Sequence, residues 1–340
     1  MATVTEAAAK KAPNMLQAIN LGLADAIAAN DRVLVLGEDV ADREGGGIVG
    51  ITNGLEARFG SHRVRSTPIT EQAIVGAAIG AALRGWRPVA EIMLMNFTTV
   101  AMDMIVNHAA KLRFMSGGQT SVPIVIRTMT GAGRGSGGQH SDYLEAWFAH
   151  TAGMKVVTAS NPADAYGLMR AAIDDPDPVM VIENMPSYWT PHPEWARPLT
   201  PGEIVPIGKA LTVREGTDLT IVAYSRMVVE AMNAARVLEG EGISAEVIDL
   251  RTISPWDREA VLASVGKTGR LLVVHEAVTP FGVGAEIAAS VGHALFGKLM
   301  GPIERLGAAY SPVPFSKPLE TAFMPGADRI ADTARAMTRA

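Results

Sequence analysis

The segment from Thr67 to Gln72 (Thr-Pro-Ile-Thr-Glu-Gln) places one carboxylate, Glu71, directly before a stretch with no other polar side chain. That stretch, Ala73 to Leu83, contains only Ala, Ile, Val, Gly and Leu, which predicts a helix buried on every face. Burial without a partner raises the pKa of a carboxylate, so Glu71 could share a proton with a bound ring nitrogen. Alternatively, Glu71 only complements the helix dipole, with Thr67 as the cap and Pro68 near the first position.

A second candidate, His140, stands at the end of a glycine-rich loop. Residues 131–138 contain five glycines, a density that permits left-handed backbone angles or the close approach of a ligand. A histidine beside such a loop can reach a substrate and titrate near neutral pH, as a general acid must. The alternative is an ordinary solvated histidine in front of a helix that begins at Ser141 and Asp142.

The same loop contains Gly133-x-Gly135-x-x-Gly138, which matches the dinucleotide-binding fingerprint. The match is weak, because no acidic residue follows about 20 positions later at a strand end and no helical periodicity begins at Gly138. A nicotinamide-dependent oxidoreductase therefore stays open as an alternative. A Walker-type phosphate loop is excluded, because no Gly-Lys-Ser/Thr follows.

The elements that must position these residues alternate between short apolar runs and helical patterns, which predicts an α/β fold with parallel sheets. The length of 340 residues suggests two domains. A proline-rich segment interrupts the alternation, so we expect a first α/β domain over 1–190, a linker over 191–206 and a second α/β domain over 207–340. The expected strands are Val33–Leu36, Pro88–Met93, Val122–Arg127, Met154–Thr158, Pro178–Ile182, Leu219–Tyr224, Ala245–Leu250 and Leu271–His275.

Polar residues follow several of these strands. Ligands of parallel sheets bind beyond the carboxyl ends of the strands, so a cleft is expected there. The residues concerned are Glu38, Asp39, Glu183, Asn184, His275 and Glu276.

Composition excludes several classes of protein. A net charge of -5, with no basic run longer than two residues, argues against nucleic-acid binding. The longest apolar stretch, 73–83, is far shorter than the roughly 20 residues needed to span a bilayer, so we expect no membrane insertion. The N-terminal residues do not resemble a secretory signal, and we expect a cytoplasmic protein. The absence of cysteine excludes disulfides and thiolate metal sites.

Several motifs, in order along the chain, resemble one family. They resemble the β subunit of the thiamine-diphosphate-dependent decarboxylase component of 2-oxo acid dehydrogenase complexes, of the pyruvate, branched-chain 2-oxo acid or acetoin dehydrogenase type, in the transketolase-like superfamily. The resemblance implies a pyrimidine-binding domain followed by a transketolase C-terminal-like domain. The motifs are 67–72, Phe97, 107–118, 138–141, 207–210, 214–216, 223–227, 248–252, 274–277 and 312–315.

The resemblance implies roles for particular side chains. Glu71 would hydrogen-bond the N1′ nitrogen of the cofactor's aminopyrimidine and favour its imino tautomer. Phe97 would pack against that ring and Met93 would line the same pocket, although both could be ordinary core residues. His140 would stand at the entrance for substrate and lipoyl group. A structural potassium ion, held mainly by backbone oxygens, would lie at Ile124, Ala172, Ile173, Asp175 and Asp177.

The chain lacks the Gly-Asp-Gly segment that supplies magnesium and diphosphate ligands in thiamine-diphosphate enzymes. The resemblance therefore implies that Mg²⁺ and the diphosphate are bound through an α subunit, in an α2β2 heterotetramer. The acyl group would pass to a lipoyl-bearing dihydrolipoyl acyltransferase. Departures from the family pattern at 142–144, 151–154 and 188–195 leave the substrate open. A noncatalytic assembly subunit remains a further alternative.

Overall fold

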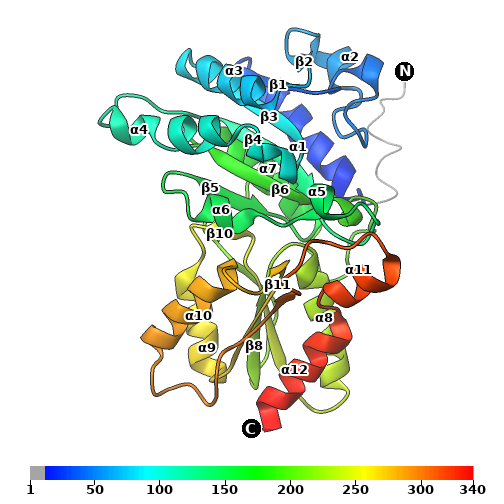
Figure 1. Ribbon diagram of the computed structural model, residues 1–340, viewed down its shortest axis with the longest axis vertical. Helices are drawn as coiled ribbons and strands as arrows, with labels where there is room; N and C mark the ends of the chain where they lie inside the picture. Colours follow the sequence, from blue (N-terminus) through cyan, green and yellow to red (C-terminus); the bar gives the residue numbers. More distant parts are fainter. Residues whose placement is uncertain (1–11, 340) are drawn as a thin grey trace.

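The computed structural model describes residues 12–339. Residues 1–11 of the first expected domain and Ala340 of the second lie outside that range. The chain forms two lobes, one above the other in Figure 1, each built on its own sheet. One sheet has seven strands in the order β10-β5-β6-β4-β3-β1-β2, and the other has five in the order β12-β11-β8-β9-β7.

The first sheet is parallel except for its edge strand β10. Its central strands are buried on both faces, as expected for a parallel sheet covered by helices. The strands are β1 (Val33–Gly37), β2 (Val64–Ser66), β3 (Arg87–Leu94), β4 (Val125–Thr130), β5 (Lys155–Thr158), β6 (Val179–Asn184) and β10 (Thr252–Ser254).

Helices α1 and α7 pack together on one face of this sheet, and α3 and the π-helical segment η4 pack on the other. Local signals define their starts: Asn14 and Gln17 form a capping box before α1, and Asn161 caps α7 just before Pro162. The helical elements of this lobe are α1 (Met15–Ala29), η2 (Asp42–Glu44), α2 (Leu55–Phe59), α3 (Glu71–Leu83), η3 (Met95–Thr99), η4 (Met104–Ala109), α4 (Leu112–Met115), α5 (Gly138–Ser141), α6 (Glu145–Ala149), α7 (Pro162–Asp174) and η5 (Met185–Ser187).

The second sheet is parallel except for β7, and it lies between the helix pair α8 and α12 and the helix pair α9 and α10. Its strands are β7 (Leu211–Arg214), β8 (Leu219–Ala223), β9 (Ala245–Asp249), β11 (Leu271–Val278) and β12 (Glu304–Ala308). Its helices are α8 (Arg226–Glu239), α9 (Arg258–Thr268), α10 (Val283–Ala294), α11 (Lys317–Phe323) and α12 (Ala327–Arg339).

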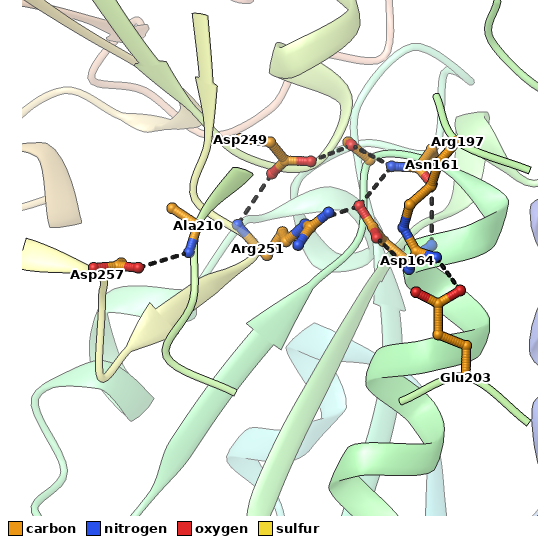
Figure 2. A network of polar contacts seen from close by, with 9 residues as sticks. Asn161, Asp164, Arg197, Glu203, Ala210, Asp249, Arg251 and Asp257 are labelled. Atoms are coloured by element: carbon orange, nitrogen blue, oxygen red, sulfur yellow. Dashed lines mark hydrogen bonds and ion pairs between the residues drawn. The ribbon is translucent and has the colours of Figure 1, made fainter. Parts of the chain in front are cut away.

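The two lobes are joined by more than the linker. Strand β10, from the second half of the chain, pairs antiparallel with β5 of the first sheet. Figure 2 shows Arg251 of the second lobe contacting Asp164 at the start of α7, with Asp249 accepting from the Arg251 backbone N–H. Arg251 Nε lies 3.0 Å from the Asp164 carboxylate, and Arg197 of the linker lies 3.2 Å from its other oxygen. Burial and the charge of Asp164 raise the pKa of Asp249.

The strands expected from sequence are confirmed to within a few residues, but the expectation for α3 is wrong in two respects. The N-cap of α3 is Thr70 rather than Thr67, and Glu71 is the first helical residue. One face of α3 is also exposed, along Gln72, Ala73, Ala77, Gly80 and Leu83. All of these residues except Gln72 are apolar or small, so their types alone do not show whether this chain or another covers them.

Within residues 12–339, no helix combines the length and the apolar character needed to cross a membrane.

Candidate active site

The residues singled out for chemistry follow neighbouring strands of the first sheet at their carboxyl ends. Glu38 follows β1, Glu71 follows β2, Phe97 follows β3 and His140 follows β4. These four strands are adjacent in the order β4-β3-β1-β2 and run parallel. The topology therefore gathers the four side chains along one edge, where ligands of such sheets bind.

Glu71 is held at this edge by the chain that leads into it. The Thr67 N–H donates to the Gly37 carbonyl at 2.8 Å, which ties the approach to α3 to the end of β1. Glu71 is 9% exposed, and no described residue hydrogen-bonds its carboxylate. A buried carboxylate is stable only with a partner, so this one is suited to a ligand that brings a nitrogen donor or acceptor.

Glu38 adds a second carboxylate beside Glu71. Burial, followed by repulsion from Glu71 and Asp39, raises the pKa of Glu38. One oxygen of Glu38 has no partner among the described residues. The two carboxyl groups therefore lie at one edge of the sheet, and no hydrogen bond from a described residue reaches either of them. The sequence analysis singled out Glu38 only as a strand-end residue.

Phe97 and His140 lie against each other. Their ring centroids are 5.6 Å apart with the planes at 73°, an edge-to-face arrangement. Asn96 holds the two elements together, because its Nδ2 donates to the Gly138 carbonyl at 3.0 Å and to the Asp142 carboxylate at 2.9 Å. Met93 and Phe97 are both half-buried and pack against the same hydrophobic cluster.

The expected surroundings of His140 need a correction. His140 lies within the one-turn helix α5, and the next helix, α6, begins at Glu145 rather than at Ser141. A single turn that follows Gly137 is too short to produce a periodic pattern in the sequence. The histidine side chain remains exposed, as access to a substrate requires.

The glycine loop does not serve as a dinucleotide-binding turn. The N–H groups of Gly133, Arg134 and Gly135 donate to the Glu320 carboxylate at 2.5 to 3.2 Å. A pyrophosphate would need these same amides, and the four-residue α5 has little dipole to offer it. The structure therefore opposes the nicotinamide alternative.

A buried charged triad that the sequence did not reveal lies within the same sheet. Arg127 on β4 donates to both oxygens of Glu183 on β6, at 2.6 and 2.9 Å, and to Glu91 on β3. Burial raises the pKa of Glu91, although Arg127 acts in the opposite sense. Tyr188 also donates to Glu183. Glu183, Arg127 and Glu91 lie on the adjacent strands β6, β4 and β3, so only the strand order brings these three residues together.

Two further buried carboxyl groups lie where the lobes meet. Glu276 accepts from the Ala132 N–H at 2.7 Å and from Asn184 Nδ2 at 2.8 Å, and burial raises its pKa to about 7. Glu145 accepts from the Tyr224 hydroxyl at 2.6 Å, and burial raises its pKa to about 7 as well. The second oxygen of Glu145 has no partner among the described residues.

These raised pKa values make stability depend on pH. A carboxyl whose folded pKa exceeds its unfolded value favours the fold while it is protonated, and that contribution is lost progressively as the pH rises from 4.5, the ordinary value, to about 7. Between pH 6.5 and 8.5, ionisation of Glu145 should lower the free energy of unfolding by about 1 kcal/mol. We expect Glu145→Gln to lose less thermal stability over this range than the unmodified protein, by about 2 °C in melting temperature. Glu286→Gln, which changes an exposed carboxylate, is the control. If the melting temperatures of Glu145→Gln and the unmodified protein changed equally with pH, the raised pKa of Glu145 would be wrong.

The residues expected to hold potassium lie close together, but cationic side chains already contact them. Arg87 donates to the carbonyls of Ile173 and Asp175 at 2.7 and 3.2 Å, and Lys155 lies 2.7 Å from both carboxylate oxygens of Asp175. A potassium ion would have to share these oxygens with two positive charges. Potassium binding stays a prediction. The remaining candidates are Ile124, whose carbonyl accepts from Val179, Ala172 in α7, and Asp177, which pairs with Arg113.

Two family profiles match most of the chain. Residues 11–189 match "Transketolase, pyrimidine binding domain" and residues 208–330 match "Transketolase, C-terminal domain". A solved structure described as "Split gene transketolase, inactive beta4 tetramer" superimposes with a TM-score of 0.78, covering 96% of this chain and 99% of that one at 22% identity. Fold and site therefore define a protein of the transketolase-like class.

Two relatives narrow the class. The chain is 45% identical to "Pyruvate dehydrogenase E1 component subunit beta-2, mitochondrial" of Oryza sativa subsp. japonica, over 96% of this chain and 87% of the relative. It is 44% identical to "Acetoin:2,6-dichlorophenolindophenol oxidoreductase subunit beta" of Cupriavidus necator, over 94% of this chain and 95% of the relative. The chain belongs to the family of β subunits of 2-oxo acid and acetoin dehydrogenases.

Proposed function

We propose that this chain is the β subunit of a thiamine-diphosphate-dependent 2-oxo acid or acetoin dehydrogenase, and that Glu71 binds the aminopyrimidine end of the cofactor. The observation that carries the proposal is the Glu71 carboxylate, buried and without a described partner, in a lobe that matches the pyrimidine-binding family. An aminopyrimidine ring nitrogen would supply the missing hydrogen bond.

The chain's own residues would act by position and proton transfer. Glu71 would hold a proton at the ring nitrogen, and Phe97, half-buried, would give the ring an aromatic wall. Met93 packs against the same cluster as Phe97 and would line the pocket. His140, exposed beside Phe97, would donate a proton at the substrate entrance. Bound thiamine diphosphate would itself supply the electron sink for cleavage of the bond next to the carbonyl.

The remaining parts of the active site would come from an α subunit. Among residues 12–339, no group of three His, Asp or Glu side chains could hold a metal ion, and the chain has no Gly-Asp-Gly segment. We therefore propose that the α subunit binds Mg²⁺ and the diphosphate, in an α2β2 heterotetramer. The exposed small-residue face of α3 would suit a close helix contact in such an assembly.

The acyl product would pass to the lipoyl group of a dihydrolipoyl acyltransferase. The substrate is one of a small set, since the two relatives are named for pyruvate and for acetoin. A cytoplasmic location is part of the same proposal.

Co-expression with its α subunit tests the function. We expect cofactor-dependent release of carbon dioxide from pyruvate or a branched 2-oxo acid, or aldehyde formation from acetoin, only when both chains are present.

In the same assembly, His140→Ala should lower acylation of a lipoyl domain by about 100-fold and lower cleavage with an artificial electron acceptor much less. The function would be wrong if the assembled chains cleaved none of these substrates, and equal losses in both assays would remove the role of His140.

A further inference from the structure

Four consecutive amides of the glycine loop are bound by carboxylates of the other lobe. The Ala132 N–H donates to Glu276 on β11 at 2.7 Å. The next three amides, of Gly133, Arg134 and Gly135, all donate to Glu320 on α11, with Gly135 reaching both oxygens at 3.0 and 3.2 Å. Figure 1 shows α11 reaching up beside α5 at the boundary between the lobes.

The loop geometry explains why a carboxylate fits there. Gly131, Gly133, Gly135 and Gly137 all have positive φ, at +120°, +113°, +70° and +73°. Where the backbone alternates between right-handed and left-handed conformations, successive N–H groups point toward one side of the chain and form a concave anion-binding nest. Glu320 is 2% exposed, so its charge is stabilised chiefly by these donors.

The segment before Glu320 extends the contact as far as α5. A Cβ placed on Gly137 would lie 2.3 Å from the ring of Phe315, and one on Gly138 would lie 3.3 Å from Pro312. The second lobe therefore contacts the glycine loop from Ala132 to Gly138, the first residue of α5, two residues before His140.

We propose that Glu320 is a positioning residue for His140. Its carboxylate closes the nest, which selects one conformation of a loop whose alternate glycines would otherwise sample many. That conformation sets the start of α5 and presents the imidazole to Phe97. The inference rests on the proposed role of His140, and it assigns a part in acyl transfer to the second lobe.

The test uses the assembled α and β chains carrying Glu320→Ala. We expect hydrogen exchange in peptides covering 131–140 to increase about tenfold or more, because the amides lose charge-assisted hydrogen bonds. Acylation of a lipoyl domain should fall about tenfold, while cleavage with 2,6-dichlorophenolindophenol as acceptor should change less than about twofold. Glu286→Ala, at an exposed position of α10, is the matched control and should behave like the unmodified protein.

A double-mutant cycle separates positioning from general stabilisation. If Glu320 acts through His140, adding Glu320→Ala to His140→Ala should cause no further loss of acylation. Additive losses would overturn the inference, as would unchanged exchange and acylation in Glu320→Ala. If the alanine variant does not assemble, Glu320→Gln, which keeps the shape and one acceptor, is judged by the same criteria.

The two proposals can fail separately. If His140→Ala lowers acylation selectively and Glu320→Ala matches the unmodified protein, the positioning role is wrong and the proposed function stands. If His140→Ala lowers both activities equally, the role of His140 and the inference that rests on it are both overturned. Absence of any cleavage by the assembled unmodified chains would overturn the proposed function itself.

Discussion

Replacing Glu71 by Gln is expected to lower substrate cleavage by the assembled protein about 1,000-fold or more, with assembly unchanged. The amide has almost the shape of the carboxyl, so α3 and its packing should persist. It cannot hold a transferable proton at a ring nitrogen, and this is the property that the proposed function requires of Glu71. The measurement is the turnover number with saturating cofactor, together with the mass of the assembly in solution.

A noncatalytic assembly subunit makes the opposite prediction. In that case Glu71→Gln would leave the activity of the reconstituted complex unchanged. Glu286→Gln serves as a control for the loss of one carboxylate at an exposed site. A moderate loss accompanied by dissociation of the complex would assign Glu71 to assembly rather than to catalysis.

Arg127→Met is expected to destabilise the first lobe by about 3 to 5 kcal/mol. The guanidinium is 1% exposed and is the cation that binds both Glu91 and Glu183. Its removal leaves two buried carboxylates without their charged partner, a larger penalty than the value of the ion pairs themselves. Thermal unfolding should show a decrease in melting temperature of about 10 °C.

A surface arginine is the matched control for this change. Arg113 pairs with Asp177 at 2.5 Å, but the arginine side chain is 47% exposed, so Arg113→Met should cost no more than about 1 kcal/mol. Adding Glu91→Gln and Glu183→Gln to Arg127→Met should restore part of the lost stability, because the uncompensated charges are then removed. Equal effects of the two single arginine changes would show that the triad contributes little.

Local patterns in the sequence predicted eight of the strands and singled out Glu71, but they did not predict β2, β7, β10 or β12. Short apolar runs between turn residues correspond to β1, β3, β6 and β8 because parallel strands are buried on both faces. Glu71 was identified because it is an isolated carboxylate before an apolar helix. Both properties depend on neighbours in the chain, which a single sequence displays.

Features that depend on distant pairing could not be predicted in this way. The contact of Glu320 with Gly133 joins residues 187 positions apart, and Arg127 meets Glu183 across 56 positions. The antiparallel pairing of β10 with β5 also links two halves of the chain that sequence analysis treats as separate domains. Strand order and register determine these contacts, and a local pattern contains neither.

The central claim is that Glu71 contacts the cofactor's pyrimidine ring, and the most direct test is an experimental structure of the assembled α and β chains with thiamine diphosphate. We expect a Glu71 carboxylate oxygen within about 3 Å of the N1′ nitrogen, with Phe97 against the face of the ring. A pyrimidine ring bound elsewhere, with the Glu71 carboxylate turned to solvent or to another protein group, would contradict the account.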